Sequence, residues 1–319
     1  MIKKTIQKIL FFYLVIITNA SALIEIDITE GNREPLPIAV TNFFYAEDAI
    51  KDLDQISMDV SKVISADLER SGLFKSIDQE AFIQKTASMH IRPRHEDWRL
   101  INAQALVTGE LEVDNDKLRV EFRLWDTFAE KEIEALVLIT TIDNWRRISH
   151  MIADKIYERL TGEEGYFDTR ILYVSENGPK NNRIKKLAIM DQDGFNHRYL
   201  TSGKELVLTP RFNPVKQEIT YLSYFKNLPR VYLLDIQTGI QEVVGDFPGM
   251  TFAPRFSSDG EKIIMSLARD GNSDIYVMDI KSRVVERLTD RPAIDTPPSY
   301  SPDGKKITFN SDRGGSQQI

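Results

Sequence analysis

Hydrophobic and polar positions in the second half of the chain repeat with a long period. Three similar stretches begin at Pro210, Pro254 and Pro298, so each start lies 44 residues after the one before it. The runs ITYLSY, IIMSLA and ITFNSD within them are rich in β-branched and aromatic residues, which favour strands. Asp-Gly pairs at Asp259 and Asp303 predict tight turns in front of two of these strands. A repeat of this size with several short strands is typical of a β-propeller blade.

The two ends of this repeat domain are irregular. ILYVSE at residues 171–176 matches the second strand of the later repeats, but no proline-led strand precedes it, and the last repeat stops at Ile319 after its second strand. The chain therefore supplies about three and a half repeats, while the smallest propellers need about four blades. Because an unclosed sheet edge exposes unpaired backbone groups, we expect a truncated gene product, the alternative being a fragment that assembles with another chain.

The first half of the chain mixes the periods of strands and helices. Isoleucines alternate with acidic residues over 24–28, which predicts a half-buried strand. Apolar residues at helical spacing predict one amphipathic helix over 56–73 and another that follows Asn144 and ends at Gly162. Further strands are predicted at 36–44, 105–113, 117–125 and 133–142, the middle two forming a hairpin. This mixture favours an α/β (α+β) domain.

The N-terminus has the pattern of a secretory signal peptide. Three lysines precede an apolar run over 9–17, and Ala20, Ser21 and Ala22 form a small-residue cleavage sequence. We expect residues 1–22 to be removed after Ala22, the alternative being an uncleaved membrane anchor. No later segment approaches the roughly 18 apolar residues of a spanning helix. The mature chain is therefore predicted to be periplasmic, with an α/β domain at 23–164, a linker over 161–166 and the repeat domain at 165–319.

The net charge and the motifs that are missing from the sequence mainly exclude classes of function. The formal charge of −7 becomes −10 without the signal peptide, which argues against a nucleic-acid partner. The sequence contains no GxSxG, HExxH, P-loop or dinucleotide fingerprint and no cysteine. The histidines are predicted to be structural: His90, His95, His150 and His197. We expect no catalysis, cofactor or metal, and expect binding through loops on a rigid scaffold.

Several segments resemble the TolB family of the Tol-Pal envelope system. They are LIEIDITEGNREPLPIAV at the predicted mature start, GYFDTRILYVSE between the domains, and the repeat SPDGKKITFNSDRGG. The resemblance implies a non-enzymatic periplasmic adaptor that binds the lipoprotein Pal and the inner-membrane protein TolA. It also implies roles in outer-membrane integrity and in invagination during cell division. Six blades are usual in this family, so about 115 residues of the repeat domain would be absent here.

Partner-binding residues follow from the same resemblance together with propeller geometry. The loop that enters each inner strand is predicted to lie at one mouth of the ring, first at Leu208 and Thr209. The two later loops are the predicted Pal site: Met250, Thr251, Phe252 and Ala253, then Asp295 and Thr296. Packing of Phe252 and Ala253 between blades is the alternative.

The TolA site is predicted at the mature N-terminus. It comprises Leu23, Ile24, Glu25, Ile26, Asp27 and Ile28. This segment is expected either to add to a partner sheet as an edge strand or to pack within its own domain. Two alternatives to the adaptor function remain, namely the propeller portion of a secreted peptidase or lyase, and an inactive truncated remnant.

Overall fold

A computed structural model describes residues 24–26, 34–46, 53–84, 92–226, 228–245, 247 and 250–319. The chain divides into two compact units, Met1–Asp168 and Thr169–Ile319, which are described separately below. The predicted signal peptide and its cleavage site at Ala22 lie outside the described residues. Among the residues that are described, no helix has the length and apolar character needed to cross a bilayer.

The first unit is built on a five-stranded mixed sheet with the order β2-β1-β3-β4-β5. Its strands are β1 (Leu36–Val40), β2 (Phe74–Ser76), β3 (Ala105–Asp114), β4 (Lys117–Asp126) and β5 (Lys131–Thr141). Strand β1 pairs in parallel with both β2 and β3, whereas β3, β4 and β5 form antiparallel hairpins. The predicted hairpin is confirmed, and its two-residue loop places Asn115 and Asp116 at positive φ, as a tight primed turn requires.

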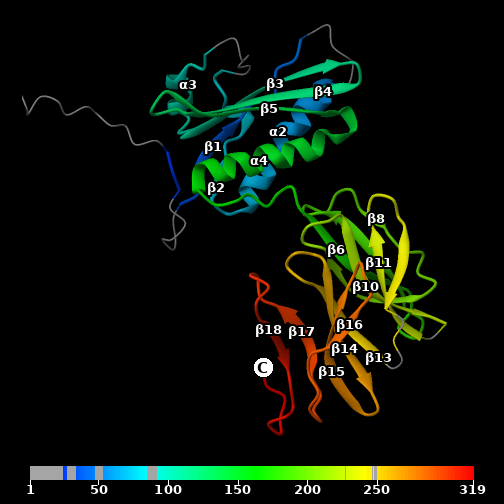
Figure 1. Cartoon of the computed structure of the whole chain (residues 1–319). Coiled ribbons are helices and arrows are strands. Elements are labelled where there is room, and N and C mark those ends of the chain that lie inside the picture. The colour runs from blue at the N-terminus through cyan, green and yellow to red at the C-terminus, as the bar shows by residue number, and fades with distance from the viewer. Residues whose placement is uncertain are drawn as a thin grey trace, which may run out of the picture. The chain divides into compact units, whose positions relative to one another are not determined.

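Two long helices cover one face of this sheet (Figure 1). They are α2 (Leu53–Arg70) and α4 (Trp145–Thr161), and both confirm the helices predicted from apolar spacing. Gly162 takes the left-handed conformation, with φ 75°, that ends α4. The apolar faces of these helices pack against alternate strand residues such as Ile38 and Val107, which places the main core of the unit between helices and sheet.

The opposite face of the sheet carries a smaller apolar cluster. Ala39 and Leu106 point to this side because successive strand residues alternate between faces, and they pack with Trp98 of the short helix α3 (His95–Leu100). Neither α3 nor β2 was predicted, since three to six residues carry too little periodicity to identify an element. Short 3-10 turns at Gln79–Ala81 and Ile142–Asn144 complete the described elements of the unit.

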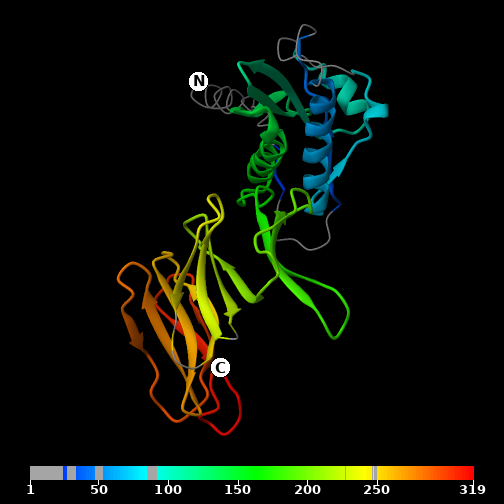
Figure 2. The same ribbon diagram turned by 90° about the vertical axis from the view of Figure 1, so that its right-hand side faces the viewer.

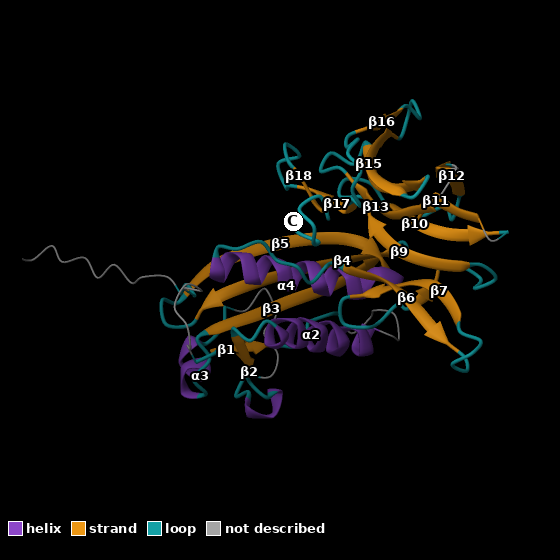
Figure 3. Ribbon diagram, turned by 90° about the horizontal axis from the view of Figure 1, so that it is seen from below, coloured by secondary structure: helices purple, strands orange, loops and turns teal. Residues whose placement is uncertain are grey.

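The second unit consists of antiparallel sheets that follow one another along the chain (Figure 2). Figure 3 shows its described residues as strands and loops, in contrast to the helices of the first unit. The first sheet contains β6 (Arg170–Asn177), β7 (Ile184–Asp191) and β8 (Arg198–Tyr199). The second contains β9 (Leu206–Phe212), β10 (Glu218–Phe225), β11 (Leu228–Asp235) and β12 (Gln241–Gly245). The third contains β13 (Met250–Phe256), β14 (Lys262–Arg269), β15 (Asn272–Asp279) and β16 (Val285–Arg287), and the last contains β17 (Thr296–Tyr300) and β18 (Ile307–Asn310).

Neighbouring sheets of this unit are joined face to face by apolar side chains. Ile189 and Ile219 belong to the cluster between the first two sheets, and Val231 and Met265 to the next. Ile264 packs toward Phe309 between the last two. Antiparallel sheets packed one on the next in this way are the architecture of a propeller, and the predicted combination of an α/β domain with a β-propeller domain is confirmed.

Candidate partner-binding site of the repeat unit

Each proline-led inner strand carries a β-bulge at the same repeat position. In β9, Thr209 and Pro210 together stand opposite Tyr221 of β10. In β13 the pair is Ala253 and Pro254, and the register of β17 shifts over the equivalent residues. Proline lacks the N–H that a regular ladder needs, so a bulge lets it sit inside a strand. The repeating P-x-(Phe/Tyr) sequence therefore indicates a β-bulge in the inner strand.

This geometry corrects one prediction. Met250, Thr251, Phe252 and Ala253 were expected in a loop entering the inner strand, but all four lie within β13, and Thr296 begins β17. Leu208 and Thr209 likewise belong to β9. Proline was taken as the start of each strand, because it interrupts regular pairing, whereas the bulge carries the strand across it. Of the predicted residues in this region, Asp295 alone precedes its strand.

The bulges hold two non-glycine residues in the left-handed region. Thr209 has φ 47° and Ala253 has φ 46°, although a side chain with a Cβ is strained there. Both residues occupy the position immediately before proline. The conformation is shared by these two repeats, and strained backbone of this kind is often found at ligand-binding and active sites.

Burial separates the predicted site residues into two groups. The side chains of Thr251 and Asp295 are 0% exposed. Phe252, Ala253 and Thr296 are partly exposed. The two buried residues can only stabilise the surface from within, whereas the three partly exposed residues can contact a partner.

Asp295 is held by an ion pair that the sequence did not indicate. Arg313 Nη2 donates to Asp295 Oδ2 over 2.9 Å, and its Nε donates to Ser311 Oγ over 2.7 Å. Burial alone would raise the pKa of Asp295, but the hydroxyls of Ser311 and Thr289 and the Arg313 charge outweigh it and hold that pKa below its usual range. Arg313 lies 18 residues after Asp295 in a turn, so no sequence period connects the two.

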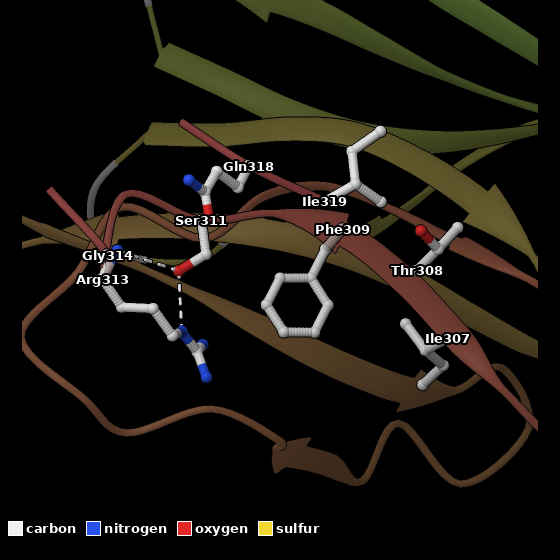
Figure 4. A pocket seen from close by; sticks show the side chains of 8 residues that line it. All are labelled: Ile307, Thr308, Phe309, Ser311, Arg313, Gly314, Gln318 and Ile319. Carbon is white, nitrogen blue, oxygen red and sulfur yellow. Dashed lines mark hydrogen bonds between the residues drawn. The ribbon is translucent and has the colours of Figure 1, made fainter. Parts of the chain in front are cut away.

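A pocket of about 340 Å³ lies beside this ion pair. Figure 4 shows Phe309 between Arg313 and Ile307, with the hydrogen bonds from Arg313 to Ser311 drawn. The Arg313 guanidinium stands 5.4 Å from the centre of the Phe309 ring, a cation–π distance. The lining residues are Ile307, Thr308, Phe309, Ser311, Arg313, Gly314, Gln318 and Ile319. Its apolar wall and single cation suit a binding surface better than a catalytic centre.

The predicted N-terminal site is described only at Ile24, Glu25 and Ile26, and these three residues form no strand there. Ile26 N–H donates to the Leu160 carbonyl over 2.6 Å, and Ile24 N–H donates to Asp126 Oδ2 over 2.9 Å. Ile26 belongs to the main core of the first unit. One hydrogen bond to a helix end and one to a side chain do not make a ladder, although the predicted isoleucine alternation does bury Ile26 and expose Glu25. Leu23, Asp27 and Ile28 lie outside the described residues.

The histidines differ in their environments. His150 and His95 are buried, and His197 is exposed and packs edge-on against Tyr199. Burial lowers the pKa of His95, which favours its neutral form. His90 lies outside the described residues.

Two family models match the chain, one mainly in each of its two units. The model of the TolB amino-terminal domain matches residues 24–133, and that of the TolB beta propeller domain matches residues 157–319. A curated relative, the Tol-Pal system protein TolB of Pelagibacter ubique (strain HTCC1062), is 61% identical over 254 residues. That similarity covers 78% of this chain and 57% of the relative, so the chain spans little more than half the relative's length.

A solved structure is similar over most of the chain. The crystal structure of TolB from Acinetobacter baumannii matches with a TM-score of 0.77 and 32% sequence identity. The match covers 90% of this chain and 68% of the Acinetobacter protein.

Proposed function

The chain belongs to the TolB family, and on this premise we propose that it is a non-enzymatic periplasmic adaptor of the Tol-Pal system. The observation that carries the proposal is its 61% identity to a Tol-Pal system protein across both units. In this role it supports outer-membrane integrity and invagination during cell division. A propeller peptidase or lyase, the alternative drawn from sequence, has less support because both halves of the chain match TolB models.

The lipoprotein Pal is the partner we propose for the mouth at β13 and β17. Phe252, Ala253 and Thr296 supply its partly exposed surface. Beneath them, Thr251 is fully buried and Asp295 is fixed by Arg313. A rigid, preformed surface loses little conformational entropy on binding, and partly exposed aromatic residues such as Phe252 are common binding hot spots.

The inner-membrane protein TolA is the partner we propose for the segment 23–28. In the described part of that segment, Ile24 and Ile26 donate to groups of the first unit, and Ile26 enters its core. Addition of this segment to a partner sheet would use the same backbone groups. Binding to TolA therefore requires the segment to leave its own unit, and the two arrangements exclude each other.

Co-purification with a purified Pal lipoprotein domain tests the adaptor proposal. We expect the chain to retain Pal, and Phe252→Glu to weaken retention at least tenfold by placing a charge in the contact. Val284→Glu is the matched control, because Val284 is an exposed apolar residue of the same unit away from the mouth. Equal retention by both variants would contradict the location of the site. Failure of the unsubstituted chain to bind Pal, while a TolB relative binds it, would contradict the function.

A further inference from the structure

A second hollow of the repeat unit lies at the other ends of the inner strands. It has a volume of about 430 Å³ and is lined by the last residues of β9, β13 and β17 with the turns that follow them. Arg211 and Arg255 occupy the same repeat position, 44 residues apart, on neighbouring inner strands. The third strand has Ser299 at this position. Arg255 follows Met250 by five residues of β13, which corresponds to roughly 17 Å of strand between this hollow and the first residue of the mouth.

The two arginines of this hollow, of which Arg255 is partly buried and Arg211 is exposed, lack an anionic partner among the described residues. Among the described residues, neither guanidinium forms an ion pair, and Arg211 donates only a long bond of 3.4 Å to the Pro210 carbonyl. The Arg255 Nε atom is buried and has no hydrogen-bond partner. Burial lowers the pKa of Arg255, and the neighbouring charge of Arg211 lowers it further. Two like charges thus share one partly enclosed space, an arrangement that costs stability unless something neutralises it.

The aspartates of the two turns that follow β13 and β17 accept hydrogen bonds within those turns. Asp259 accepts hydrogen bonds from Ser257 Oγ and the Glu261 N–H. Asp303 accepts from Ser301 Oγ and the Lys305 N–H in the same way. No acidic residue is among the residues that line the hollow. Ser258 and Tyr300, which also line the hollow, carry hydroxyl groups that can donate to an anion.

We propose that this hollow binds a small oxyanion, with a phosphate or carboxylate group held between Arg211 and Arg255. The guanidinium group matches such anions because its planar N–H donors form paired hydrogen bonds to two oxygens. A bound anion would supply the missing acceptor for Arg255 and separate the two like charges. Phosphate and carboxylate ligands share this chemistry, and the choice between them is made by the test below.

Titration calorimetry of the whole chain, with sodium phosphate and sodium citrate at constant ionic strength, tests the proposal. We expect saturable binding of at least one of these anions, and the tighter one identifies the ligand class. Arg211→Gln and Arg255→Gln should each weaken that binding about tenfold or more, since a hydrogen bond to a charged group is lost. Arg255→Lys keeps the charge and most of the side chain, so it should fold normally and yet bind more weakly than the unsubstituted chain.

Arg269→Gln is the matched control, because Arg269 is an exposed arginine of the same unit outside the hollow. It should leave the dissociation constant unchanged. Binding that is equally strong in the Arg211→Gln, Arg255→Gln and Arg269→Gln proteins would overturn the proposal, as would the absence of saturable binding of either anion. Because these variants leave the β13 mouth intact, retention of Pal reports the adaptor function separately.

Discussion

The imidazole Nδ1 of His150 on α4 lies 2.5 Å from the Oδ2 atom of Asp67 on α2, and both side chains are buried. Asp67 Oδ1 also accepts a hydrogen bond of 2.9 Å from Arg70 Nη1. The two helices that cover the sheet are thus connected by polar groups within an otherwise apolar interface. Removing one member of such a pair costs more than the pair itself contributes, because the other member stays buried without it.

Replacement of Asp67 by alanine should therefore destabilise the first unit by about 3 kcal/mol. Urea unfolding followed by tryptophan fluorescence measures this change selectively, since Trp98, Trp125 and Trp145 are the three tryptophans of the chain and all lie in this unit. Asp59→Ala, on the same helix but partly exposed, should cost about 0.5 kcal/mol or less. Similar effects of the two substitutions would contradict a special role for the helix–helix pair.

The stability of the repeat unit should decrease in acid because of two equivalent turn aspartates. Hydrogen bonds from the Ser257 hydroxyl and the Glu261 N–H hold the pKa of Asp259 below its usual value, and Ser301 and Lys305 do the same for Asp303. A carboxyl whose pKa is lower in the folded state contributes stability above its unfolded pKa of about 4, and this stability is lost as the pH falls through the folded value.

Thermal unfolding followed by circular dichroism between pH 5 and pH 2 checks this expectation. The midpoint should fall with pH, and the double substitution Asp259→Asn with Asp303→Asn should make the fall smaller. Asp270→Asn is the control, because this exposed aspartate accepts none of those turn hydrogen bonds. A double variant with the same pH dependence as the unsubstituted chain would refute the assignment.

Local periodicity made much of the fold predictable. The 44-residue repeat anticipated where the central strands lie, and β10, β14 and β18 cover ITYLSY, IIMSLA and most of ITFNSD. Helices α2 and α4 were predictable for the same reason, since 17 or 18 residues at helical spacing carry a strong signal. These elements are determined mainly by residues that are close together in the sequence, so the sequence pattern alone predicts them.

Features that depend on distant residues were not predictable. The burial of Asp295 depends on Arg313, and the contacts of Ile26 depend on Leu160. The bulges were mistaken for strand starts because a proline indicates only a missing N–H and not how the opposite strand accommodates it. Arg211 and its equivalent in the next repeat were visible in the sequence, but their lack of partners became evident only from the packing of adjacent sheets.

Relief of backbone strain at the first bulge should stabilise the repeat unit. Thr209 is an exposed β-branched residue at φ 47°, a conformation that costs a non-glycine residue about 1–2 kcal/mol. Thr209→Gly should therefore stabilise the unit by about 0.5–1 kcal/mol after the entropic cost of glycine. Thr296→Gly is the matched control in β17 and should destabilise it by about 1 kcal/mol, because Thr296 is not among the residues at positive φ. Urea unfolding followed by circular dichroism measures the free energy of unfolding of both variants. If Thr209→Gly destabilised the unit as Thr296→Gly does, the backbone of Thr209 would not be strained.

The ion pair between Asp295 and Arg313 should contribute to the stability of the mouth in a way that a double-mutant cycle can isolate. Arg313→Ala leaves a fully buried carboxylate without its cation, and we expect a loss of about 2 kcal/mol, reduced from the value for a wholly buried pair because Arg313 is partly exposed. Asp295→Asn removes the charge that Arg313 neutralises, so the double variant should be more stable than the sum of the single effects predicts. Arg269→Ala, at an exposed arginine of β14, should change the unfolding free energy by about 0.5 kcal/mol or less. Strictly additive effects of the two substitutions would mean that Arg313 stabilises this region through its contact with Phe309 and not through Asp295.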